Sequence, residues 1–161
     1  MVAKHHGRYF PVQDLRQKSF ITREGVSLLG ISDAAEAIGL RSVGVKVDFE
    51  KLEKEAPLPC IVHWYQRHFI VVYKISKDKV YVADPAKGLT TYSKDEFLKG
   101  KLSDGDESIM KVLSQSVING NGSHENGFLI DRKEVGIALL LEPTPEFYNY
   151  EPESSKTNAK A

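Results

Sequence analysis

The chain has 161 residues, 41% of them apolar and 27% charged, which suits one globular domain with a single core. Lys plus Arg and Asp plus Glu both total 22, so the formal net charge is zero, which argues against a nucleic-acid partner. No apolar run approaches the roughly 20 residues of a helix that crosses a bilayer. The one cysteine, Cys60, excludes an internal disulfide and a cysteine-based zinc site. We expect a cytoplasmic domain without metal or cofactor.

The first 56 residues predict short helices separated by turns, with one strand among them, because apolar residues recur mainly at helical spacing. The expected helices cover residues 1–6, 12–19, 31–38 and 49–55, and the expected strand covers 43–47. Ser32 or Asp33 is the expected N-cap of the third helix, and Asp48 that of the fourth. Gly7 and Gly39 each follow a helix, as expected of helix-ending glycines.

From residue 57 onward the pattern becomes strand-like, with many β-branched and aromatic residues. The expected strands cover residues 60–64, 68–76, 79–85, 89–93 and 136–143. Ser93 is expected to cap a helix over 94–100, with Glu96 at the capping-box position. The strand at 136–143 is apolar throughout and is therefore expected to be central. Helices first and an antiparallel meander afterwards predict an α+β domain.

Two stretches differ from this core in composition. Residues 100–134 are polar, with an amphipathic helix expected over Glu107–Val117. Residues 149–161 have no large apolar side chain after Tyr150 and are expected to form a disordered tail or a linker. We therefore predict one domain over residues 1–148.

A histidine and an aspartate stand at neighbouring strand ends: His68 opens one strand and Asp84 closes the next. A histidine held by a carboxylate is the basic part of a nucleophilic triad. A two-residue turn at Lys77–Asp78 would place Val71 opposite Asp84, which leaves His68 offset by three residues, about 10 Å along the strand. Twist, a bulge or the turn at Pro85 has to close that gap. The residues alone favour a simpler interpretation, in which Asp84 is a turn residue and His68 a strand terminus.

The other candidate side chains give weaker signals. Cys60 lies within an apolar strand, which is typical of a buried structural cysteine rather than a nucleophile. His63 is expected opposite His68, where a cross-strand packing pair is favoured over a metal site. Residues 1–56 contain no cysteine, so a thiol nucleophile preceding the histidine is missing.

The order of segments resembles the bacteriocin-processing peptidase domain, a papain-like cysteine peptidase domain of ABC exporters. The segments that carry the resemblance are MVAKHHGRYFPVQDLR, TREGVSLLGISDAAEAIGLRSVGVKVDFEKL, PLPCIVHW, HFIVVYKI, VYVADPAKG, YSKDEFLKG and ALLLEPTPEFY. Together they cover about 110 residues in the family's order, which makes the resemblance specific. It implies the papain-like fold, with N-terminal helices packed on an antiparallel sheet, and leaves residues 100–134 as a segment longer than the family's usual link.

The resemblance makes His68 the catalytic histidine and Asp84 the aspartate that orients it. It implies a double-glycine leader peptide as substrate and no cofactor. It also implies two partners, the membrane and ATP-binding domains of a parent transporter in the bacterial inner membrane. The family's cysteine and its oxyanion-hole glutamine match nothing in this chain, so we predict that these 161 residues do not cleave leader peptides.

Three interpretations follow from a retained His68 and Asp84 together with a missing cysteine. The chain is a peptidase domain whose nucleophile segment is missing, or a non-catalytic domain that binds the substrate of a peptide or toxin exporter, or an interaction domain unrelated to export. Retention of both His68 and Asp84 favours the first. A missing nucleophile segment would uncover an apolar cleft, which predicts self-association.

Overall fold

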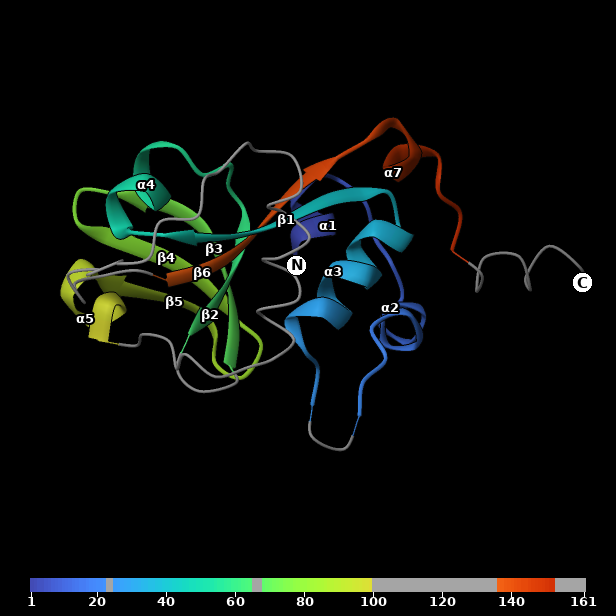
Figure 1. The fold of residues 1–161 in the computed structure, drawn as a ribbon, viewed down its shortest axis with the longest axis horizontal. Coiled ribbons are helices and arrows are strands. Elements are labelled where there is room, and N and C mark those ends of the chain that lie inside the picture. The colour runs from blue at the N-terminus through green and yellow to red at the C-terminus, as the bar shows by residue number, and fades with distance from the viewer. Residues whose placement is uncertain (23–24, 65–67, 100–135, 153–161) are drawn as a thin grey trace, which may run out of the picture.

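The computed structural model describes residues 1–22, 25–64, 68–99 and 136–152. A six-stranded antiparallel sheet, in the order β1-β6-β2-β3-β4-β5, is accompanied by short helices (Figure 1). The strands are β1 (Leu40–Val47), β2 (Cys60–Trp64), β3 (His68–Ser76), β4 (Lys79–Asp84), β5 (Gly88–Ser93) and β6 (Gly136–Pro143). The helices are α1 (Val2–His5), α2 (Val12–Lys18), α3 (Leu28–Ala37), α4 (Phe49–Lys54), α5 (Lys94–Lys99) and α7 (Pro145–Asn149). The predicted α+β class is confirmed.

Helix α3 begins three residues earlier than predicted. Its N-cap is Ser27, whose hydroxyl oxygen accepts a hydrogen bond from the Gly30 amide at 3.0 Å, so neither Ser32 nor Asp33 is the cap. A Cβ at Gly30 would lie 2.3 Å from the Ser19 carbonyl oxygen. The glycine therefore permits a close approach to the end of α2 rather than breaking the helix.

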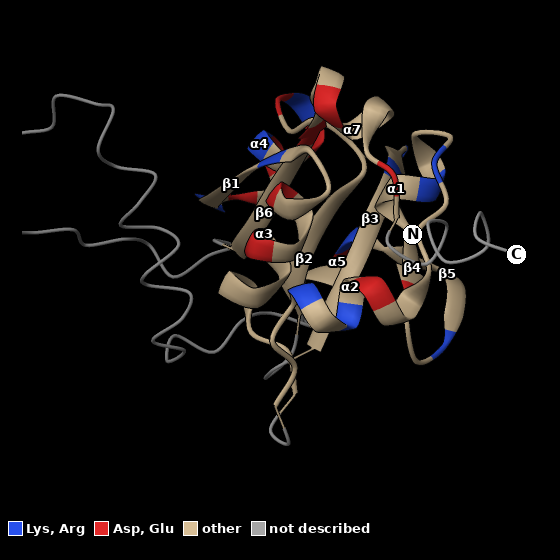
Figure 2. Ribbon diagram, turned by 90° about the vertical axis from the view of Figure 1, so that its right-hand side faces the viewer, with Lys and Arg blue, Asp and Glu red and all other residues tan. Residues whose placement is uncertain are grey.

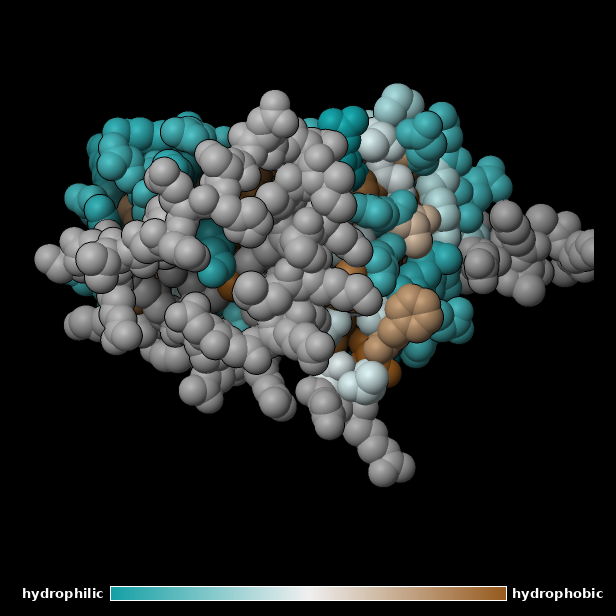
Figure 3. Space-filling view, in the orientation of Figure 1, coloured by the Kyte–Doolittle hydropathy of each residue, from teal (hydrophilic) through white to brown (hydrophobic). Residues whose placement is uncertain are grey.

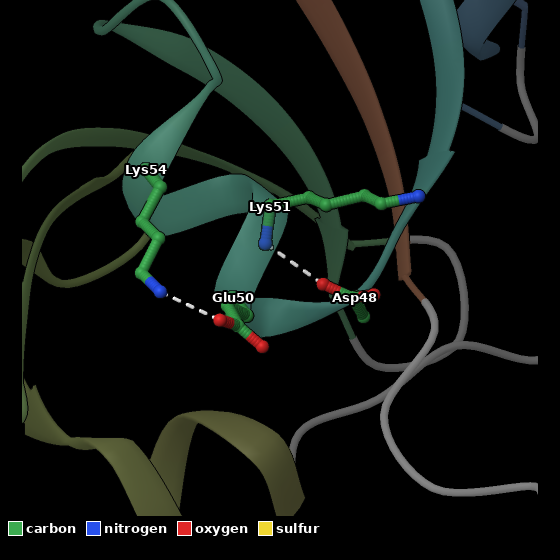
Figure 4. Close-up of polar contacts among 4 residues, drawn as sticks. All are labelled: Asp48, Glu50, Lys51 and Lys54. Carbon is green, nitrogen blue, oxygen red and sulfur yellow. Dashed lines mark hydrogen bonds and ion pairs between the residues drawn. The ribbon is translucent and has the colours of Figure 1, made fainter.

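The other capping predictions are confirmed. The Asp48 side chain accepts from the Lys51 amide at 2.8 Å and begins α4, as Figure 4 shows. Glu50 and Lys54 on the same helix form an exposed ion pair, which contributes little to stability. At α5, the Ser93 amide donates to Glu96 at 2.8 Å and the Glu96 amide donates to the Ser93 hydroxyl at 3.2 Å, which is a capping box.

Strand β6 joins the two halves of the sheet. It pairs with β1 over its whole length and with β2 through Leu139 and Ala138. The strand was predicted to be central, and it is flanked by a strand on each side but lies second from one edge of the sheet. Helix α7 follows directly and places Phe147, which is fully buried, against Gly39. A Cβ on Gly39 would lie 2.3 Å from the Phe147 backbone nitrogen, and its φ of +88° also favours glycine. The last described residues thus pack on the end of α3.

Buried apolar side chains form two clusters. The helix-side cluster joins α1, α3 and α7 to the sheet and contains Val2, Phe10, Leu28, Ala35, Ile38, Leu40, Val71, Ala83, Ile137, Leu139, Leu141 and Phe147. The α4–α5 cluster fills the other side and contains Phe49, Leu52, Cys60, Val62, Trp64, Ile70, Val72, Val80, Val82, Phe97 and Ala138. Figure 1 shows the same division, with α1, α2 and α3 on one side of the sheet and α4 and α5 on the other.

The described surface is mixed in character. Figure 2 shows segments of both charge signs on the same elements, for example along α2. Figure 3 shows polar residues over most of the described part of one face, with apolar groups between them. In the described part of the chain, every helix is too short or too polar to cross a bilayer.

Two predicted segments are only partly covered by the description. The segment 100–134, with its expected helix at Glu107–Val117, lies outside the described residues. Of the predicted tail, residues 149–152 are described, and the Tyr150 ring lies 5.6 Å from the Phe10 ring. The domain limit at residue 148 stays a prediction.

Candidate active site

The structure brings His68 and Asp84 together. The imidazole Nε2 of His68, at the start of β3, lies 3.0 Å from Oδ1 of Asp84, at the end of β4. The Asp84 side chain is completely buried, whereas the His68 side chain is 34% exposed. A buried carboxylate thus holds an imidazole that a substrate can still reach, which is the arrangement required of a general base.

A β-bulge in β3 changes the predicted register between the two strands. Lys77 and Asp78 form the expected two-residue turn, both with positive φ, and Ser76 pairs with Lys79. Farther along the hairpin the register shifts by one residue, between Val72 and Lys74.

The shift corrects the predicted offset. Val71 lies opposite Ala83, so the predicted pairing of Val71 with Asp84 is wrong. Continuing the observed register puts Ile70 opposite Asp84 and leaves His68 two residues away instead of three. Because side chains alternate with a period of two, this correction puts His68 and Asp84 on the same face of the sheet.

The Asp84 carboxylate is fixed and ionised by its neighbours. Burial acts to raise its pKa, but hydrogen bonds from the Ala86 amide and from His68, with a further contribution from the Lys87 amide, hold the pKa below its usual value. The Ala86 amide lies 2.7 Å from the same Oδ1 that contacts His68. An ionised carboxylate at this position favours the protonated form of the imidazole that proton abstraction produces.

The sequence reasoning did not identify Ala86 as a site residue. Its backbone amide bonds to the side chain two residues earlier, which is the Asx-turn pattern expected of an aspartate at a turn. The Asp84–Pro85 pair therefore indicates a turn, as the simpler interpretation had it, without excluding a contact with His68. Asp84 is a turn residue, and the same turn orients its carboxylate toward His68.

Cys60 has the properties of a structural cysteine. It is completely buried at the start of β2, opposite Val72, and burial raises the pKa of its thiol to about 12. Val72 lies four residues from His68, which is about 13 Å along β3. The prediction that Cys60 is not the nucleophile agrees with this position, because a reactive thiol needs access and a lowered pKa.

His63 is not opposite His68. The strand β2 continues to Trp64, which is the residue that pairs with His68, and His63 pairs with Phe69. The predicted pairing of His63 with His68 is therefore off by one residue, because β2 stays paired with β3 up to Trp64. The His63 side chain is buried, with its ring 4.9 Å from that of Phe69, so it packs across the strands as predicted, with a different partner. Within the described ranges, His, Cys, Asp and Glu form no group of three or more able to hold a metal ion.

Comparison with known proteins agrees with this fold. The family model "Peptidase C39 family" matches residues 1–100. The chain is 36% identical over 104 residues to the lactococcin-G-processing and transport ATP-binding protein LagD of Lactococcus lactis subsp. lactis, covering 62% of this chain and 15% of that protein. It is 29% identical over 96 residues to the colicin V secretion/processing ATP-binding protein CvaB of Escherichia coli, covering 60% of this chain and 14% of that protein. The chain thus spans a small part of the length of these relatives.

Two solved structures have a similar fold. A double glycine motif protease from an AMS/PCAT transporter, in complex with the leader peptide, is 28% identical with a TM-score of 0.64, covering 89% of this chain and 79% of that chain. The peptidase domain of Streptococcus ComA is 24% identical with a TM-score of 0.62, covering 89% of this chain and 85% of that chain. The predicted papain-like peptidase fold is confirmed. Because the family model covers residues 1–100, the chain belongs to the Peptidase C39 family.

Proposed function

We propose that this chain is the leader-peptide-processing domain of a peptide exporter, with His68 as general base and Asp84 as the residue that orients it. The observation that carries the proposal is the 3.0 Å contact between Nε2 of His68 and the buried Oδ1 of Asp84. The chain's similarity to a double glycine motif protease and to bacteriocin-processing transport proteins supports the substrate class.

In this proposal the two imidazole nitrogens have different tasks. Asp84 holds Nε2, so Nδ1 is the nitrogen that would take the proton of an attacking thiol and return it to the leaving amine. The low pKa of the Asp84 carboxyl keeps the orienting group negative throughout the neutral range. The imidazolium formed during attack is therefore stabilised by a charge that is already in place.

These 161 residues do not contain the attacking thiol. Cys60 is the one cysteine of the sequence, and its thiol is completely buried with a pKa of about 12. We infer that the domain binds a double-glycine leader peptide and, without a cysteine added from outside these residues, leaves it intact. In this chain alone, His68 has no nucleophilic thiol from which to abstract a proton.

Leader cleavage followed by mass spectrometry tests this proposal. The chain as given is expected to leave a double-glycine leader peptide intact. The same chain, joined at Met1 to a segment that supplies a cysteine and a glutamine from a catalytically active relative, is expected to cut it. His68→Ala in the joined protein should reduce the rate by at least about a hundredfold, because general-base catalysis contributes that much. Retention of full activity in that variant would remove His68 from the mechanism.

A second candidate function is a non-catalytic domain that binds the substrate of a peptide or toxin exporter. The burial of Cys60 favours it, because the described site has no accessible thiol beside His68. Titration of a leader peptide into the chain, followed by calorimetry, decides between the candidates together with the cleavage assay. Binding without cleavage by the joined protein supports the second function, and the absence of any binding contradicts both.

The location and the partners belong to the same proposal. We infer a domain on the cytoplasmic side of the bacterial inner membrane, contacting the membrane and ATP-binding domains of a parent transporter, since its relatives are transport ATP-binding proteins. Self-association is a further expectation, supported by large exposed side chains such as Tyr9 and Phe20, which are 76% and 74% exposed. Light scattering at increasing concentration checks it, and a monomer at every concentration would refute it.

A further inference from the structure

Arg8, which follows α1, contacts a segment that lies 140 residues farther along the chain. Its guanidinium donates to the backbone oxygens of Tyr148, at 2.7 Å, and of Tyr150, at the end of α7. We propose that Arg8 is a positioning residue, which holds α1 against α7 and so fixes where a thiol joined ahead of Met1 stands relative to His68. The contacts between Arg8 and α7 are observed, and their consequence for catalysis rests on the proposed function.

Helix α7 needs hydrogen-bond donors at its C-terminal end. The last four carbonyl groups of an α-helix have no partner within the helix, and α7 ends at Asn149 with Tyr150 as its C-cap. The last turn of α7 contains no basic side chain of its own. Because a guanidinium presents several N–H groups in a rigid fork, Arg8 alone bonds two of these oxygens. It also brings the positive charge that a helix C-terminus favours.

Helix α1 in turn depends on contacts outside itself. It has four residues, far fewer than a helix needs to be stable in isolation. The rings of His6 and Phe10 lie 6.2 Å and 5.7 Å from the Phe147 ring of α7. Among the described residues, the two Arg8 bonds are the hydrogen bonds that join residues 1–10 to the rest of the chain. Because apolar contacts are not directional, these bonds are what can fix the orientation of α1.

The orientation of α1 bears on the site through the strands that α1 packs on. Val2 of α1 belongs to the same buried cluster as Val71 of β3 and Ala83 of β4. Ala83 directly precedes Asp84, and β3 begins at His68. A thiol supplied from a segment joined to α1 therefore reaches the imidazole only as accurately as α1 is placed. A displacement of about 1 Å between reacting groups can cost about a hundredfold in rate.

Hydrogen exchange followed by NMR tests the link between α1 and α7 in the chain as it exists. The amides of residues 5–8 bond within the α1 turn, and the Tyr150 amide bonds to the Glu146 oxygen of α7. Arg8→Ala should lower the protection of both groups about tenfold, because it removes two charge-assisted hydrogen bonds at a partly exposed position. Arg8→Lys, whose ammonium lacks the fork, should give a smaller loss.

The matched control is Arg16→Ala. Arg16 is an exposed arginine in the last turn of α2, and within the described residues its side chain makes no hydrogen bond or ion pair. Its removal should leave the protection of α1 and α7 unchanged. Equal protection of both helices in Arg8→Ala and in the native chain would overturn the proposal.

The catalytic consequence is measured in the protein joined at Met1 to a cysteine-bearing segment. Arg8→Ala should lower kcat about tenfold and leave KM nearly unchanged, because the substrate contacts stay and only the placement of the thiol changes. The pKa of the added thiol, measured from the pH dependence of its alkylation, should rise toward the ordinary cysteine value as the thiol loses its place beside His68. A loss of stability alone would not move that pKa in the folded protein.

The two proposals fail in different ways. Lowered protection of α1 with an unchanged kcat and an unchanged thiol pKa would overturn the positioning role and leave Arg8 as a structural contact. A joined protein that leaves leader peptide intact with Arg8 in place would contradict the proposed peptidase function. The exchange result would still decide whether Arg8 holds α1 against α7.

Discussion

The start of β2 and the end of β4 each bury an ionisable side chain, with opposite results. Cys60 is completely buried among apolar side chains, and burial raises the pKa of its thiol to about 12. The Asp84 carboxyl is as little exposed to solvent, yet its pKa is lowered, because the Ala86 amide and His68 donate to it. The two groups share a very low exposure and differ in their hydrogen-bond donors.

The difference comes from where each residue stands in the sheet. Cys60 lies opposite Val72, in the middle of β3. The backbone around Cys60 takes part in strand pairing, and the side chains that surround Cys60 are apolar. At the end of β4 the chain leaves the ladder, and the Ala86 amide is able to bond to a side chain. The donors that keep the buried Asp84 charge therefore come from the turn that follows β4, whereas Cys60 is enclosed by apolar side chains and its thiol stays protonated.

Thiol labelling gives the largest expected effect. A pKa raised from 9.0 to about 12 lowers the thiolate fraction about a thousandfold, and burial restricts access as well. Iodoacetamide should therefore modify Cys60 in the native chain at least about a thousandfold more slowly than in the chain unfolded in urea. Mass spectrometry measures both rates. Labelling at similar rates would show that Cys60 is accessible and would reopen it as a nucleophile.

Removal of the Asp84 carboxylate is expected to cost the most stability. Asp84→Ala leaves the Ala86 amide and His68 without their acceptor, so the free energy of unfolding should fall by about 3 kcal/mol in urea titrations. His68→Ala is the control and should cost about 1 kcal/mol, because a third of the His68 side chain is already in water. If Asp84→Ala and His68→Ala lower the free energy of unfolding equally, the His68–Asp84 pair contributes no more than an ordinary surface contact.

A polar replacement of the buried thiol should cost less. Cys60→Ser places a hydroxyl among apolar neighbours and is expected to lower the free energy of unfolding by about 2 kcal/mol. Cys60→Ala, which adds no polar group, should cost about 1 kcal/mol. Both variants should bind leader peptide as the native chain does, measured by calorimetry. Loss of binding with retained stability would place Cys60 in the recognition site.

Much of the fold was predictable from the sequence because local chemistry determines it. The caps at Asp48 and Ser93 and the turn at Lys77–Asp78 depend on neighbouring residues alone, and the structure has them as predicted. The N-cap at Ser27 was missed because the predicted helix began only at Ile31, whereas α3 begins before Gly30 and its packing on Ser19 requires that glycine.

The register around the site was not predictable in the same way. The segment Phe69–Val72 is apolar on both faces, so its alternation does not show where a residue bulges out of the ladder. Counting from the turn gave an offset of three between His68 and Asp84, and only the tertiary pairing reveals the shift beside Tyr73. Sequence identified the two residues through a family resemblance, and the structure supplies the reason they meet.

The pH dependence of stability gives the smallest effect and tests the Asp84 charge itself. The lowered pKa of Asp84 means that its ionised form stabilises the folded chain, and this contribution is complete above the unfolded value of about 3.9. As the pH falls below that value and through the folded pKa, both states bind the proton and the contribution is lost. The stability difference between the native chain and Asp84→Asn should therefore shrink as the pH falls below about 4. Glu50 and Glu146, whose pKa values are also lowered, are present in both chains and cancel in the difference.

Urea titrations at each pH measure the stability difference between the native chain and Asp84→Asn. A difference that stays constant to about pH 2 would show that Asp84 carries no stabilising charge in the folded state.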